Sequence, residues 1–153
     1  MSKMHKILFV CTGNTCRSPM AAALASLAFK ELVIDIEVLS AGVATDDGYP
    51  ASDNAILAMQ EQNLCLAKHK SAQINTELCD AALILTMTQG HLFYVKQINT
   101  QANAFTLGEY VGANGDIADP FGGNLEVYRA CAAQIKELVT LAAAKYKEEL
   151  WNQ

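Results

Sequence analysis

Residues 6–30 of this chain read KILFV-CTGNTCRSPM-AAALASLAFK. Residues 6–10 form a short run in which Lys6 is followed by four apolar residues, with β-branched and aromatic side chains typical of a buried strand. A polar segment with one glycine follows at 12–17, and the remainder of the stretch is rich in Ala and Leu. We expect a helix there, with Ser18 as N-cap and Pro19 at the first helical position. The stretch predicts a strand, a polar loop and a helix in succession.

The rest of the chain repeats this alternation of strands and helices. Composition and periodicity predict strands at residues 33–40, 81–86 and 104–107, and helices at 52–62, at 89–98 and from Asn124 onward. The intervening residues 108–123, rich in Gly, Asp and Asn, are expected to form a loop. Such alternation favours a parallel sheet with helices on both faces, an α/β fold. In such sheets ligands bind at the carboxyl ends of the strands, which the loops after the first and fourth strands can both reach.

Composition and charge exclude several classes of protein. Hydrophobic residues make up 52% and charged residues 18% of the sequence, so we expect a folded core and a single domain over residues 1–153. The net charge is −5 without a run of basic residues, which disfavours a nucleic-acid partner. No apolar stretch reaches the ~20 residues that span a bilayer. The apolar block after residues 1–6 is too short for a secretory leader, so we expect a cytoplasmic monomer without a membrane partner.

Five cysteines, an odd number, occur without the small secreted framework that disulfides accompany. Cys65, Cys79 and Cys131 are expected to be buried thiols that pack as small apolar side chains. Cys11 and Cys16 stand apart, because both belong to the polar loop after the first strand. Two of the three histidines, His5 and His91, are expected at the surface.

The loop of residues 11–18 has the composition of an oxyanion site. Between a strand and a helix N-terminus, it presents successive backbone N–H groups to one point. Curled around a phosphate, it would place the Cys11 thiol beneath the phosphorus and the Arg17 guanidinium on two oxygens. These donors would lower the pKa of the Cys11 thiol and favour the nucleophilic thiolate. A buried cysteine with an unrelated arginine is the other interpretation. The flanking strand, the Gly-Asn turn and the presence of only two arginines in the chain favour catalysis.

Residues 10–19, VCTGNTCRSP, resemble the signature of the low-molecular-weight protein tyrosine phosphatases. Asp119-Pro120-Phe121 resembles the Asp-Pro-aromatic motif in the late loop of that family. Residues 40–42 and 85–87 also lie where the family has similar segments, so the likeness runs from about residue 5 to residue 147. It implies a three-layer α/β/α fold with a four-stranded parallel sheet, Rossmann-like and of the phosphotyrosine protein phosphatase I type.

The resemblance also implies a two-step reaction that uses no metal or other cofactor. Cys11 attacks phosphorus to form a phosphocysteine, and Asp119 protonates the leaving group and then activates the water that hydrolyses the intermediate. The equatorial oxygens are held by Arg17 and by the loop residues Thr12, Gly13, Asn14, Thr15, Cys16 and Ser18. By itself an Asp-Pro in a loop is an ordinary turn, and Asp116 is the competing carboxylate, which we interpret as solvated.

Further roles follow from the same resemblance. Asn14, Ser18 and His69 match a network that fixes the loop and favours the Cys11 thiolate. Cys16 matches a neighbour that traps an oxidised nucleophile as a disulfide, and a buried bystander thiol is the alternative interpretation.

Departures from the family pattern bear on the substrate, which is expected to be a phosphorylated protein. Most tyrosine-specific members have an aliphatic residue at the position of Thr15 and two tyrosines after the Asp-Pro. Here Phe121 and two glycines follow, so fewer aromatic rings are present to enclose a phenyl group, although Phe121 and Tyr49 could line a cleft. A Thr15 hydroxyl could accept from a guanidinium N–H. These features are similar to the bacterial protein arginine phosphatases and favour phosphoarginine, with phosphotyrosine as the alternative.

Two readings from other classes remain open. Arsenate reduction uses the same loop but needs two more cysteines in a mobile segment after the third strand, and residues 86–95 contain none. A non-catalytic oxyanion-binding module is the other, although the presence of Cys11, Arg17 and Asp119 disfavours it.

Overall fold

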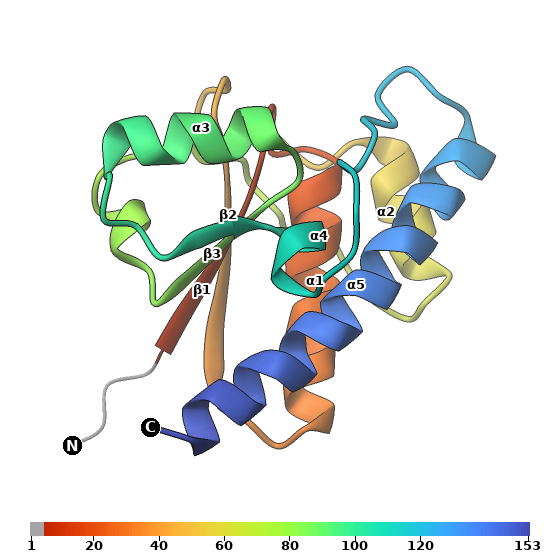
Figure 1. Ribbon diagram of the computed structural model, residues 1–153. Coiled ribbons are helices and arrows are strands. Elements are labelled where there is room, and N and C mark those ends of the chain that lie inside the picture. The colour runs from red at the N-terminus through yellow and green to blue at the C-terminus, as the bar shows by residue number, and fades with distance from the viewer. Residues whose placement is uncertain (1–4) are drawn as a thin grey trace.

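A computed structural model describes residues 5–153 (Figure 1), so the sequence interpretation of residues 1–4 lies outside the described residues. Four parallel strands form one sheet in the order β2-β1-β3-β4. They are β1 His5–Cys11, β2 Ile36–Gly42, β3 Leu83–Thr86 and β4 Ala104–Thr106. This confirms the predicted four-stranded parallel sheet. Cys11 pairs with Gly42, so the loops that leave β1 and β2 start side by side.

Helices cover both faces of the sheet, as the alternation predicts. Figure 1 shows α3 on one face and α1, α2 and α5 on the other. Side chains of β1 alternate between two buried clusters: Ile7 and Phe9 pack with α1 and α5, whereas Leu8 and Val10 pack toward α3. The helices are α1 Arg17–Glu31, α2 Asp53–Gln60, α3 Gln89–Ile98, α4 Leu107–Tyr110 and α5 Leu125–Trp151, with a 3₁₀ turn, η1 Leu78–Asp80.

Most boundaries shift by one to three residues from the sequence prediction, and three differences have a clear structural cause. The strand expected from residue 33 begins at residue 36, because Val33 has a φ of 60° and its N–H donates to the Lys30 carbonyl in the turn that ends α1. The loop expected at 108–123 opens with α4, capped by the Thr106 hydroxyl. Ser18 is not the N-cap of α1, which begins at Arg17. The Ser18 hydroxyl is buried and contacts the loop instead.

The predicted burial of the other cysteines holds in part. Cys79 and Cys131 are buried, whereas Cys65 is exposed in the segment after α2, so the prediction for Cys65 was wrong. All five thiols are free. No helix within residues 5–153 has both the length and the apolar character needed to cross a bilayer.

Candidate active site

The loop after β1 lies so close to the end of β2 that only glycine fits there. A Cβ atom on Gly42 would lie 2.5 Å from the Thr12 carbonyl oxygen and 3.1 Å from Asn14 Cβ. Because the nearest atom belongs to the backbone, a larger residue would displace the loop. The shape of the loop therefore depends on a residue of the neighbouring strand.

Asn14 holds the loop in a left-handed turn. Its φ is 58°, a conformation that asparagine adopts more readily than most residues. Its side-chain Nδ2 donates to the hydroxyls of Ser18 at 2.7 Å and Ser40 at 3.0 Å, and its Oδ1 accepts from the Ala72 N–H at 2.9 Å. The His69 Nε2–H donates to the Asn14 carbonyl at 2.7 Å. The structure thus brings together Asn14, Ser18 and His69, which the sequence analysis groups as loop support, and adds Ser40.

Cys11 lies buried at the end of β1, with its Sγ 2.8 Å from the Ser18 hydroxyl oxygen. Burial raises the pKa of the Cys11 thiol, while the Ser18 hydroxyl and amide, the Arg17 charge and the Asn14 amide act to lower it. Burial is the largest of these influences. The predicted net lowering of this pKa is therefore not confirmed, because desolvation of the thiolate outweighs the donors around it.

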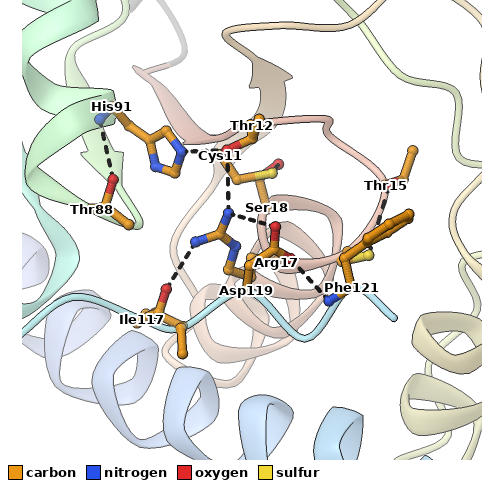
Figure 2. Close-up of polar contacts among 12 residues, drawn as sticks. Cys11, Thr12, Thr15, Arg17, Ser18, Thr88, His91, Ile117, Asp119 and Phe121 are labelled. Carbon is orange, nitrogen blue, oxygen red and sulfur yellow. Dashed lines mark hydrogen bonds and ion pairs between the residues drawn. The ribbon is translucent and has the colours of Figure 1, made fainter. Parts of the chain in front are cut away.

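Arg17 is buried and reaches the same place from the start of α1. Its Nη1 donates to the Ile117 carbonyl at 2.8 Å and its Nη2 to the Thr12 hydroxyl at 3.4 Å (Figure 2). Nη2 also lies 3.5 Å from Asp119 Oδ2, whose side chain is half exposed. The guanidinium therefore connects the loop after β1 with the loop before α5.

One cavity of about 230 Å³ opens between these two loops. Asp119 lies at its edge in a turn in which the Phe121 N–H donates to Asp119 Oδ1 at 3.1 Å. The Phe121 ring is 78% exposed and forms part of the wall. Residues from both predicted motifs line this single cavity, namely Cys11, Thr12, Gly13, Asn14, Thr15, Cys16, Arg17, Asp119 and Phe121.

Tyr49 is the one residue proposed for substrate contact that does not line the cavity. It is 52% exposed, and its hydroxyl donates to Asp46 Oδ2 at 3.3 Å. Thr15 does line the cavity, and its hydroxyl makes one long contact with Cys16 Sγ at 3.7 Å. Cys16 Sγ also lies 3.3 Å from the Tyr128 hydroxyl and 3.4 Å from Ser52 Oγ. Within residues 5–153, no three His, Cys, Asp or Glu side chains are grouped so that they could hold a metal ion.

His91 was expected at the surface, and this was wrong. Its side chain is only 6% exposed, and its Nε2 lies 2.9 Å from the Thr12 hydroxyl oxygen. Burial and the Arg17 charge lower the pKa of His91 to about 4, although Asp116 and Asp119 act in the other direction. No short sequence motif identifies such a residue, because 79 positions separate it from Thr12.

The sequence matches the family described as low molecular weight phosphotyrosine protein phosphatase over residues 6–152. A protein-arginine-phosphatase of Geobacillus stearothermophilus is 46% identical over 149 residues, covering 95% of this chain and 98% of the relative. A low molecular weight protein-tyrosine-phosphatase, PtpB of Staphylococcus epidermidis, is 37% identical over 145 residues, covering 94% of this chain and 99% of the relative. A solved structure of the YwlE arginine phosphatase is similar, with a TM-score of 0.88 and 37% identity, covering 93% of this chain and 95% of that one. That structure is of a cysteine-to-serine mutant with a phosphorylated active site serine. The chain belongs to the low molecular weight phosphotyrosine protein phosphatase family.

Proposed function

We propose that this protein dephosphorylates phosphoarginine in proteins through a phosphocysteine intermediate. The observation that carries the proposal is the single cavity onto which Cys11, Arg17 and Asp119 converge from three separate elements. Its volume of about 230 Å³ leaves room for a phosphoryl group and part of the side chain that bears it. A cysteine, a buried guanidinium and a partly exposed carboxylate at one point are the groups that cysteine-dependent phosphoryl transfer requires.

Each residue has one proposed role. The Cys11 thiolate attacks phosphorus in line as the bond to the leaving group breaks, and Asp119 gives that group a proton. Asp119 then takes a proton from water, which attacks the phosphocysteine, releases inorganic phosphate and restores the thiolate. Arg17 and the amides of residues 12–18 hold the equatorial oxygens through both steps. The phosphorylated active site serine in the YwlE mutant supports a phosphoenzyme in that relative.

Two residues of the cavity wall support phosphoarginine over phosphotyrosine. Among residues 5–153 the Thr15 hydroxyl has only its long contact with Cys16, so its oxygen is free to accept a hydrogen bond from a guanidinium N–H. Phe121 supplies a single exposed ring against which a flat guanidinium can stack. The relative at 46% identity is a protein-arginine-phosphatase, which agrees with this choice.

Phosphotyrosine is the second candidate, favoured by the PtpB relative and by the ring of Phe121. The test compares kcat/KM on one peptide that carries phosphoarginine and on the same peptide with phosphotyrosine, for wild type and Thr15→Ile. We expect wild type to prefer phosphoarginine and Thr15→Ile to lose at least about 10-fold of that preference, because the isoleucine leaves a guanidinium donor unpaired. A tyrosine preference that Thr15→Ile leaves unchanged would overturn the assignment.

Variants of the proposed nucleophile and acid test the mechanism itself. Cys11→Ser should reduce turnover of p-nitrophenyl phosphate by at least about 10³-fold while inorganic phosphate still binds, since the loop that holds the anion remains. Asp119→Asn should slow leaving-group departure most for poor leaving groups. Normal turnover by Cys11→Ser would exclude the phosphocysteine.

We further propose that the protein acts as a cytoplasmic monomer without nucleic-acid or membrane partners. Five free thiols, one of them exposed, suit a reducing compartment, and the negative net charge does not suit a phosphate backbone. Cell fractionation and sedimentation of the purified protein test the location and the oligomeric state, respectively.

A further inference from the structure

A buried imidazole stands behind the anion cavity without a role in the mechanism above. His91 lies in the first turn of α3, and Figure 2 shows its ring pointing to Thr12 beside the Arg17 guanidinium. We propose that neutral His91 is a positioning residue, which holds the Thr12 hydroxyl so that Thr12 in turn fixes the Nη2 side of the Arg17 guanidinium. The proposal rests on the proposed role of Arg17 as the grip on the phosphoryl oxygens.

The proposed hydrogen-bond chain runs from Arg17 through the Thr12 hydroxyl to His91. A guanidinium can only donate, so the contact of 3.4 Å between Arg17 Nη2 and Thr12 Oγ1 uses a lone pair of the hydroxyl. The hydroxyl proton then remains free to point at His91 Nε2, 2.9 Å away, which accepts it in the neutral tautomer that carries its proton on Nδ1. Thr12 is otherwise exposed to solvent, so without His91 its hydroxyl would turn freely.

The two sides of the guanidinium differ in how firmly they are held. Nη1 donates to the Ile117 carbonyl at 2.8 Å, and the Ile117 N–H donates to the Met87 carbonyl at 2.9 Å at the end of β3. Nη2 has only the long contact with Thr12 and the pair with half-exposed Asp119, and Asp119 must release it to exchange protons during the reaction. The Thr12 hydroxyl is therefore the constant partner of Nη2, and His91 is what orients it.

The surroundings of His91 keep it neutral near pH 7. The charged groups that face it are Arg17 from α1 and the carboxylates Asp116 and Asp119 from the loop before α5. Burial and the Arg17 charge oppose a second proton on the ring and lower the pKa of His91 to about 4. The neutral tautomer that accepts at Nε2 carries its one proton on Nδ1, which is buried and has no hydrogen-bond partner within residues 5–153. If the ring did gain a proton at Nε2, it would donate to Thr12 and bring a positive charge toward Arg17. The Thr12 hydroxyl proton would then have no acceptor on His91.

The test uses His91→Gln and His91→Leu with p-nitrophenyl phosphate as substrate and sulfate as a competitive inhibitor. A glutamine amide can reach the position of Nε2 and accept from Thr12, whereas leucine only fills the space. We expect His91→Leu to lose about 10-fold in kcat/KM and to bind sulfate several-fold more weakly, and His91→Gln to stay within about 3-fold of wild type. Thr12→Val should lose about as much kcat/KM as His91→Leu. The double variant should be no worse than either single variant, since both substitutions break the same series of hydrogen bonds.

Two readouts separate positioning from a merely structural role. The ratio of kcat/KM between wild type and His91→Gln should be constant above pH 6.5 and fall as the pH approaches 4, because only wild type gains the imidazole proton. The ¹⁵N shifts of the wild-type imidazole should show Nε2 without a proton at pH 7. A protonated Nε2 at pH 7, additive losses in the double variant, or an unchanged His91→Leu enzyme would each overturn the proposal.

The outcome also separates this proposal from the proposed function. Absence of phosphatase activity in wild type would overturn the function, whereas the sulfate affinity and the imidazole shifts would still decide the role of His91. A wild-type enzyme that hydrolyses p-nitrophenyl phosphate together with an unaffected His91→Leu would overturn the positioning role alone.

Discussion

Cys11 Sγ and Ser18 Oγ lie 2.8 Å apart in the buried interior, one at the end of β1 and the other in the first turn of α1. This contact forms only when the loop between the two residues closes on itself, so the short distance shows that the loop is closed. Asn14 donates to the same hydroxyl, whose proton can point to the thiol at 2.8 Å or to the Ala41 carbonyl at 3.4 Å, and the thiol is the nearer partner. Ser18, which the sequence predicts as a helix cap, contacts the proposed nucleophile instead.

Replacing this hydroxyl should make the thiol harder to ionise. Ser18→Ala removes the hydroxyl that lowers the pKa of Cys11 and leaves burial, which raises it. We expect the midpoint of iodoacetamide alkylation of Cys11 to move to higher pH, and kcat/KM at pH 7 to fall about 10- to 100-fold, the range for a lost hydrogen bond to a charged group. Ser40→Ala is the matched control, because Ser40 also supports Asn14 but does not contact the thiol. A pH midpoint that moves equally in both variants would contradict the direct role of Ser18.

A methyl group at Gly42 should disable the loop from the neighbouring strand. Gly42→Ala would place its Cβ 2.5 Å from the Thr12 carbonyl oxygen, so the loop has to move. We expect at least a 10-fold loss of kcat/KM and a lower free energy of unfolding by about 1–3 kcal/mol, as for other overpacked sites. Gly90→Ala in α3 is the control, since its nearest neighbour would lie at an ordinary 3.6 Å and alanine favours helix. Full activity in Gly42→Ala would mean that the loop tolerates displacement.

Acid should destabilise the protein partly through His91. The pKa of His91 is lowered to about 4 in the folded protein and is about 6.5 when unfolded, so the unfolded chain takes up the proton first. The contribution of His91 to the free energy of unfolding is fully present above pH 6.5 and is lost as the pH falls through 4. We expect a loss of about 1–3 kcal/mol across that window, measured by urea unfolding, that His91→Gln lacks. Carboxylates titrate in the same range, so the difference between the two proteins is the quantity to compare. Equal pH dependence in both would contradict the buried neutral imidazole.

Oxidation should be reversible only while Cys16 is present. Peroxide converts the Cys11 thiolate to a sulfenic acid, and attack by the Cys16 thiol then forms a disulfide and releases water. Cys16 lines the same cavity as Cys11, which places the second thiol on the side from which it can meet an oxidised Cys11. We expect dithiothreitol to restore peroxide-treated wild type but not Cys16→Ser, with exposed Cys65→Ser recovering like wild type. Full recovery of Cys16→Ser would leave Cys16 as a bystander.

Local patterns account for how much of the site was predictable. Cys11 and Arg17 lie six positions apart, and the composition on either side indicates a strand before them and a helix after them. A single tight loop is therefore enough to bring the two side chains together. Asp119 and Phe121 could be assigned only through a second motif and its resemblance to a family. The parallel sheet followed from alternation, because a helix between two strands returns the chain in the same direction.

Two of the predictions that failed have different physical causes. Ser18 and Pro19 have the local preferences of a helix start, but burial beside the thiol gives the Ser18 hydroxyl better partners than the first amides of α1. Val33 is β-branched, yet it lies in the left-handed turn that ends α1. At Ser18 tertiary contacts outweighed a local preference of about 1 kcal/mol, whereas at Val33 the local hydrogen bonds of the helix end outweighed the strand preference of a β-branched residue.

The order of strands and helices, the candidate anion loop and its proposed nucleophile could be predicted from the sequence by itself, because they depend on periodicity and on residues that are neighbours along the chain. Only the tertiary structure decided that Gly42 leaves space for the loop and that His91 lies behind Arg17. The pairing of β1 with β2 and the packing of α3 on the sheet bring these residues to the loop from tens of positions away. No pattern along the chain encodes such contacts, since their geometry exists only once the sheet has formed.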